Sequence, residues 1–263
     1  NQKNSSNDTL FIASDPDIIL LYELCTKLAL NFLLNTYLRT HRRLRNDNLQ
    51  QWVQLLSNYF SKCSSCCDIF YQIILKINPD ALKVYLLDCS IDDIRQVFAQ
   101  ICEHVLKSTY LHNKIQNLEL FIEQLIILLD KSVIEQVQYS KAYFRLIYVY
   151  ATMNKSSIEY LLKLNIFQRL IHFLFGENIN NKRWNSENIK DFGFIYEIIS
   201  ILALFCYSTD FNIQKKYEKF VDEMKIYFFG QWSNRFLQEI CYAFREVSST
   251  ELTYTLQLME KLC

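Results

Sequence analysis

The chain has 263 residues, of which 51% are hydrophobic, and this content excludes a disordered polypeptide as the default. Lysine plus arginine and aspartate plus glutamate number 28 each, so the chain lacks the positive excess expected of a dedicated nucleic-acid-binding protein. Three glycines and two prolines are too few for the turns of a β-rich or α/β fold, and this shortage favours an all-α fold.

The first predicted helix begins at Asp15-Pro16, where a capping side chain precedes a proline at the first helical position. Apolar residues at three- and four-residue spacing predict one apolar face on this helix, made of Ile18, Leu21, Cys25, Leu28 and Phe32. Its polar continuation over 35–45 is expected to stay helical until Asn46-Asp47 interrupts it.

A second helix is predicted around Trp52 and Tyr59, and residues 64–67 are expected to form the break that follows it. A short apolar helix then leads to Asn78-Pro79, where the chain is expected to restart. Ser90 and Asp93 resemble a capping box, and the apolar stripe behind them predicts a helix that reaches Val105.

Further helical periodicity lies at 118–129, 133–151, 157–162, 166–175, 189–207, 212–229, 235–247 and 252–262. Between them, residues 177–188 are polar and rich in asparagine, which predicts a long loop. We therefore expect a disordered or extended lead-in at 1–14, a helical array at 15–175, a polar loop at 176–188 and a second part of the array at 189–263.

Roughly a dozen helices joined by short breaks recur at a scale of about 40 residues when they are grouped in pairs or triplets. This recurrence favours an armadillo- or HEAT-like helical solenoid over a single closed bundle. The longest strongly apolar stretch, Ile198 to Tyr207, is shorter than the ~18 residues that a membrane span needs, so we expect a buried helix there and no membrane partner.

Nine cysteines are spaced irregularly in a chain whose polar opening residues contain no secretory signal, so we expect reduced thiols and a cytoplasmic, or also nuclear, location. Cys63, Cys66 and Cys67 have metal-like spacing, and Cys102 with His104 would complete a zinc site if the fold brought them close. Ordinary reduced cysteines are the favoured alternative, because one half-site is a weak signal, and no metal or other cofactor is expected.

Four arginines within seven positions form the most concentrated charge in the chain: Arg39, Arg42, Arg43 and Arg45. They either decorate the end of a helix, where they complement its dipole, or form a docking surface for an acidic partner. The sequence contains no phosphate-binding loop and no hydrolase motif, and His104 and His112 are expected near a helix end, so no catalytic residue is predicted.

Two stretches carry a resemblance to a known family. Residues 86–98, LLDCSIDDIRQVF, resemble a leucine, cysteine, arginine and phenylalanine pattern found beyond the catalytic domain of large ubiquitin-specific proteases of the fat-facets type. Residues 35–40, NTYLRT, followed by basic residues and Trp52, resemble the segment that precedes that pattern. Together these stretches cover about Leu20 to Leu106.

The resemblance implies an armadillo-like helical region beside a papain-like catalytic domain, with ubiquitinated substrates or that catalytic domain as protein partners. The family's catalytic boxes are glycine-rich around the nucleophilic cysteine and around the histidine, and this chain has only three glycines. We therefore expect a non-catalytic scaffold. A helical-repeat adaptor unrelated to ubiquitin and a small helical enzyme are the alternatives.

Overall fold

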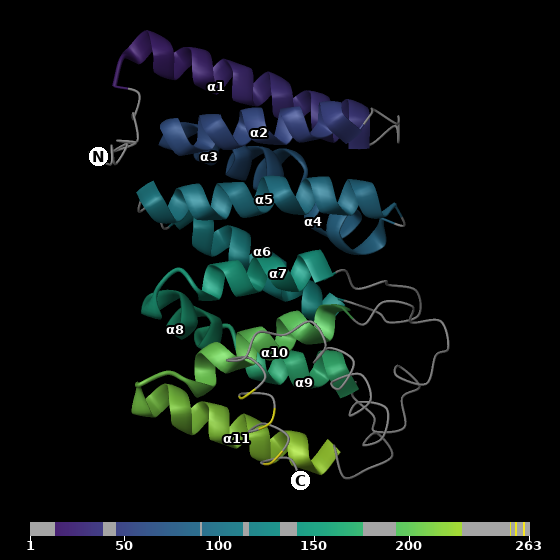
Figure 1. Cartoon of the computed structure of the whole chain (residues 1–263), viewed down its shortest axis with the longest axis vertical. Coiled ribbons are helices and arrows are strands. Elements are labelled where there is room, and N and C mark those ends of the chain that lie inside the picture. Colours follow the sequence, from purple (N-terminus) through teal and green to yellow (C-terminus); the bar gives the residue numbers. More distant parts are fainter. Residues whose placement is uncertain are drawn as a thin grey trace, which may run out of the picture. The chain divides into compact units, whose positions relative to one another are not determined.

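The structure, a computed structural model, describes residues 14–38, 46–89, 91–112, 116–131, 141–175 and 193–227, together with Thr253, Leu256 and Glu260. Within these ranges every regular element is a helix and no strand occurs, so the predicted all-α fold is confirmed (Figure 1). None of the helices in the described ranges combines the length and the apolar content that a membrane crossing requires. The predicted loop at 176–188 lies outside the described residues.

The chain divides into two compact units, each described by itself. The first consists of the described residues within 1–79 and 100–119. Its elements are α1 (Pro16–Asn31), the π-helical segment η1 (Phe32–Leu38), α2 (Asn46–Lys62), α3 (Ser64–Gln72) and the π-helical segment η2 (Ile73–Ile77). The later residues of α5 (Asp92–His112) and the first residues of α6 (Gln116–Lys131) complete this unit.

The second unit consists of the described residues within 80–99 and 120–263. Besides the remaining parts of α5 and α6, it contains α4 (Ala81–Lys83), the π-helical segment η3 (Val84–Asp88), α7 (Lys141–Ala151), α8 (Lys155–Lys163), α9 (Ile166–Phe175), α10 (Gly193–Cys206) and α11 (Phe211–Tyr227). In this unit α7 packs against both α8 and α10, while α9 packs against α8 and α11 (Figure 1).

Side chains at the helix starts explain why several helices begin where they do. Asp15 has extended backbone dihedrals and accepts the Asp17 backbone N–H at 2.9 Å, which confirms the start predicted at Asp15-Pro16. Asn154 caps α8 by accepting the Ser157 backbone N–H at 2.9 Å. Asp210 accepts the backbone N–H groups of Asn212 and Ile213 ahead of α11. Each cap satisfies a donor that the first helical turn leaves free.

The break expected at 64–67 is wrong. Ser64 is already the first residue of α3, and only Cys63, with φ −140° and ψ 108°, leaves the helical conformation between α2 and α3. Serines near a helix start are favourable, so the polar cluster that predicted a break belongs to the first turn of the following helix.

Aromatic side chains form much of the core of the first unit. Phe60, Phe70 and Tyr71 are each 1% exposed or less, and the Phe60 and Phe70 ring centroids lie 6.2 Å apart at an interplanar angle of 72°. The Tyr71 hydroxyl lies 2.7 Å from the Thr109 hydroxyl and joins α3 to the later part of α5. Buried tyrosine hydroxyls need such a partner, so this contact fixes how the two helices meet.

The core of the second unit is also aromatic and includes Phe121, Tyr143, Phe144 and Phe205, all fully buried. The Tyr143 hydroxyl donates to the Leu125 carbonyl and ties α7 to α6. The Arg169 guanidinium donates to the Leu164 carbonyl at the end of α8 at 2.8 Å and to the Ile126 carbonyl of α6 at 3.5 Å, so a cation from α9 contacts both of these helices.

Candidate functional site

The predicted arginine surface lies outside the described residues. Arg39, Arg42, Arg43 and Arg45 fall between η1, which ends at Leu38, and α2, which begins at Asn46. Their role as a docking surface stays a prediction.

The cysteines with metal-like spacing lie where α2 meets α3. Cys63, Cys66 and Cys67 are all buried, with Cys63 Sγ 3.0 Å from Ser65 Oγ and Cys67 Sγ 3.9 Å from the Phe60 carbonyl. Burial raises the pKa of the Cys66 and Cys102 thiols, which favours the thiol over the metal-binding thiolate. Across the described ranges, no three histidine, cysteine or acidic side chains are grouped so that they could hold a metal ion.

The structure brings together a serine and a histidine that the sequence did not pair. Ser57 Oγ of α2 lies 3.0 Å from His104 Nδ1 of α5. His104 and His112 were expected near a helix end; His112 is the last residue of α5, but the expectation is wrong for His104, which lies in the interior of α5. The two residues are 47 positions apart, so no local pattern signals the contact.

A polar pocket of about 240 Å³ lies beside this pair. Its lining is Gln50, Val53, Gln54, Gln100, Glu103, His104 and Lys107. Lys107 Nζ pairs with Glu103 Oε1 at 2.7 Å, and burial, followed by the Lys107 charge, lowers the pKa of His104. A neutral imidazole beside a hydroxyl is the first requirement for an activated serine nucleophile.

The remaining requirements of such a nucleophile are not met at Ser57. An oxyanion formed there would need N–H donors aimed at it, and those donors supply much of the catalysis in acyl transfer. Ser57 lies inside α2, where the neighbouring backbone N–H groups are hydrogen-bonded to carbonyls one turn earlier in the helix. We therefore interpret the Ser57–His104 contact as a polar link between two helices.

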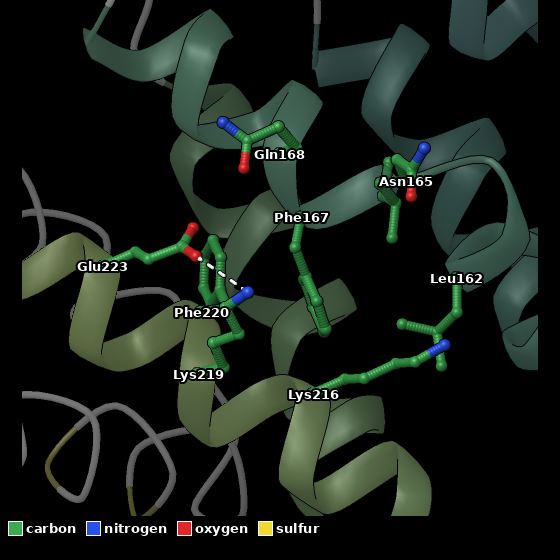
Figure 2. Close-up of a pocket in the computed structure, with 9 residues that line it drawn as sticks. Leu162, Asn165, Phe167, Gln168, Lys216, Lys219, Phe220 and Glu223 are labelled. Carbon is green, nitrogen blue, oxygen red and sulfur yellow. Dashed lines mark ion pairs between the residues drawn. The ribbon is translucent and has the colours of Figure 1, made fainter.

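A second pocket, of about 210 Å³, lies between α9 and α11, with Leu162 of α8 at its edge (Figure 2). We call it the α9–α11 groove. Its floor is apolar and consists of Ile166, Phe167 and Phe220. The Phe167 ring centroid lies 4.7 Å from those of both Phe220 and Phe205, and Phe220 is 2% exposed. These contacts hold the aromatic floor in a fixed position.

The rim of the α9–α11 groove is polar and consists of Asn165, Gln168, Lys216, Lys219 and Glu223. Figure 2 shows the two amides on the α8–α9 side and the charged side chains on the α11 side. Asn165 has φ 54°, and its N–H donates to the Leu162 carbonyl at 3.1 Å. This left-handed residue ends α8 in the usual way of a C-terminal cap and turns the chain into α9.

One side of α1 presents leucines to solvent. Leu20, Leu21, Leu24 and Leu28, which we call the outer leucine face, are 63%, 58%, 55% and 63% exposed. The opposite side of α1 contains the buried residues Thr26, Ala29 and Leu30 and packs against α2 and α3. The sequence predicted a single apolar face, and this is wrong: of the five predicted members, four are exposed in the structure.

Two curated proteins that the chain is similar to are large hydrolases. The chain is 31% identical over 186 residues to Ubiquitin carboxyl-terminal hydrolase 24 of Mus musculus, and the aligned region covers 68% of the chain and 7% of that protein. It is 22% identical over 186 residues to Ubiquitin carboxyl-terminal hydrolase 34 of Homo sapiens, and here the aligned region covers 62% of the chain and 5% of that protein. No family model and no solved structure matches the chain.

The chain therefore spans less than a tenth of the length of these relatives. The similarity extends over about two thirds of the chain and supports a relation to the large ubiquitin-specific proteases, the family group that residues 35–40 and 86–98 resemble.

Proposed function

We propose that the chain is a non-catalytic helical scaffold of a large ubiquitin-specific protease and that it positions ubiquitinated substrates or partner proteins. The similarity to Ubiquitin carboxyl-terminal hydrolase 24 over 186 residues is the observation that carries this proposal. Because the chain spans 7% of that relative, the proposal assigns cleavage of ubiquitin to a catalytic domain elsewhere in a longer protein.

The chemistry of the described residues supports a role without catalysis. Buried thiols such as Cys66 and Cys102 are poor nucleophiles, because burial raises the pKa of both and keeps them protonated. Among the described residues, Ser57 contacts His104, and the helical N–H groups around Ser57 are already hydrogen-bonded, which leaves no backbone donors for an oxyanion.

The finer architecture in this proposal is a helical solenoid. Within the second unit, α7 contacts α8, its neighbour along the chain, and also α10, while α9 contacts α8 and α11. Contacts both to the next helix and to a helix two or three positions later are typical of stacked helical arrays. Such arrays expose long side-chain surfaces, which suits a protein that positions partners.

We also propose that Arg39, Arg42, Arg43 and Arg45 form a docking surface for an acidic partner or for the catalytic domain. Replacing Arg42 and Arg43 by glutamine is expected to change the free energy of unfolding by about 0.5 kcal/mol or less, because charges that serve a docking surface contribute little to folding. Binding should weaken and become less sensitive to salt, since charge pairs steer association. Unchanged affinity and unchanged salt dependence would remove these arginines from the proposal.

The test of the scaffold proposal uses the longer protein and a version that lacks residues 14–227. A ubiquitin-based probe that reacts with an active-site cysteine should label both proteins equally, whereas removal of ubiquitin from a protein substrate should slow in the shortened one. Loss of probe labelling on deletion would contradict a non-catalytic role. A longer protein that the probe does not label would favour an adaptor unrelated to ubiquitin.

A further inference from the structure

The α9–α11 groove has the size of a pocket that accepts one or two side chains of another protein. Its volume of about 210 Å³ is below the ~300–1,000 Å³ typical of pockets that enclose small molecules. One or two side chains of a protein segment would fill it, with the apolar part against Phe167 and Phe220. This makes a protein segment a better occupant than a cofactor or metabolite.

The charges on the rim identify the chemistry of that segment. Lys219 Nζ lies 3.7 Å from Glu223 Oε1, so these two charges offset each other. Lys216 has no ion-pair partner among the described residues, and Figure 2 shows its side chain extended along the groove toward Leu162. The groove therefore presents one uncompensated positive charge beside an aromatic floor.

We propose that the α9–α11 groove binds a short acidic segment of a partner protein, in which an apolar side chain packs on Phe167 and a neighbouring carboxylate pairs with Lys216. The amides of Asn165 and Gln168, on the opposite rim, are placed to bond the backbone of that segment. Nucleic acid is a poorer occupant, because phosphate binding draws on several cations and Glu223 lies on the same rim. The proposal does not depend on the link to ubiquitin.

The experiment measures binding of a fluorescein-labelled peptide, Gly-Ser-Glu-Leu-Phe-Glu-Ser-Gly, to the 263-residue chain by fluorescence anisotropy. Lys216→Glu should weaken binding about fivefold or more, which corresponds to about 1 kcal/mol for one charged contact. Lys215→Glu is the matched control: it makes the same change in net charge at the adjacent exposed residue, which does not line the groove. A peptide with alanine in place of leucine and phenylalanine should bind more weakly to the unchanged protein.

The two lysine variants should retain the melting temperature of the original chain, because both side chains are exposed. Equal weakening by Lys215→Glu and Lys216→Glu would indicate non-specific attraction and overturn the proposal. Equal binding of the alanine peptide would overturn the aromatic floor as the anchor, and with it the proposal. Absence of binding at about millimolar peptide would also overturn the proposal.

Discussion

Truncating one outward and one inward leucine of α1 tests which side of this helix is covered in solution. Leu24 is 55% exposed and Leu30 is fully buried, although both lie in the same helix. Full burial of a leucine contributes about 1.5–3 kcal/mol, so truncating the half-buried Leu24 to alanine should cost about 1 kcal/mol. Leu30→Ala leaves a cavity and should cost about 2–5 kcal/mol. Helix propensity changes equally in the two variants, so the difference reports burial.

Urea denaturation followed by circular dichroism gives both free energies by linear extrapolation. Leu30→Ala should lower the free energy of unfolding by at least about 1 kcal/mol more than Leu24→Ala does. Equal costs would mean that Leu24 is covered in solution, either by another part of the chain or by a second molecule. In that case Leu21→Lys with Leu24→Lys would also destabilise the protein, whereas on an open face this pair should only reduce self-association.

Three further changes test contacts that hold individual helices. Asn154→Ala removes the cap of α8 and should cost about 1 kcal/mol in urea denaturation, while Asn154→Ser should keep most of the stability. Tyr71→Phe leaves the buried Thr109 hydroxyl without its partner and should lower the free energy of unfolding by about 1–3 kcal/mol. Adding Thr109→Val should recover part of this loss. If the losses of the two single variants simply add in the double variant, the hydroxyl contact does not stabilise the fold. The pKa of His104 is lowered in the folded state, so between that folded pKa and about 6.5 the unfolded chain binds more protons than the folded chain. The free energy of unfolding should therefore fall as the pH falls through this window. His104→Gln should flatten this pH dependence in melting experiments from about pH 5 to pH 8, and an unaltered slope would contradict His104 as its source.

Local signals account for the part of the fold that the sequence predicts. The scarcity of glycine and proline indicates an all-α fold, and Asp15-Pro16 marks the start of α1 because a cap acts within a few residues. The prediction at 64–67 was wrong because serine is common both in turns and in the first turn of a helix. Composition alone does not separate these two uses.

Long-range contacts account for what the sequence did not predict. Apolar residues lie on both sides of α1, so their periodicity identifies a helix but does not choose between Leu24 and Leu30 as the buried leucine. Packing against α2 and α3 makes that choice. The Ser57–His104 contact likewise depends on how α2 meets α5, and the α9–α11 groove joins Phe167 to Lys216 across 49 positions of sequence. No local pattern contains such information.

The helical backbone limits the kinds of function that the described residues support. Inside a helix each backbone N–H is hydrogen-bonded one turn back, so few remain to cradle a phosphate or stabilise an oxyanion. Recognition must then come from side chains that project from the helices, and affinity must come from apolar anchors ringed by polar groups. The α9–α11 groove has this composition, with Phe167 on its floor and Lys216 on its rim, whereas the outer leucine face consists of exposed apolar side chains on a single helix. The groove is therefore suited to discriminate among partners by charge, and the leucine face is suited to close packing against another apolar surface.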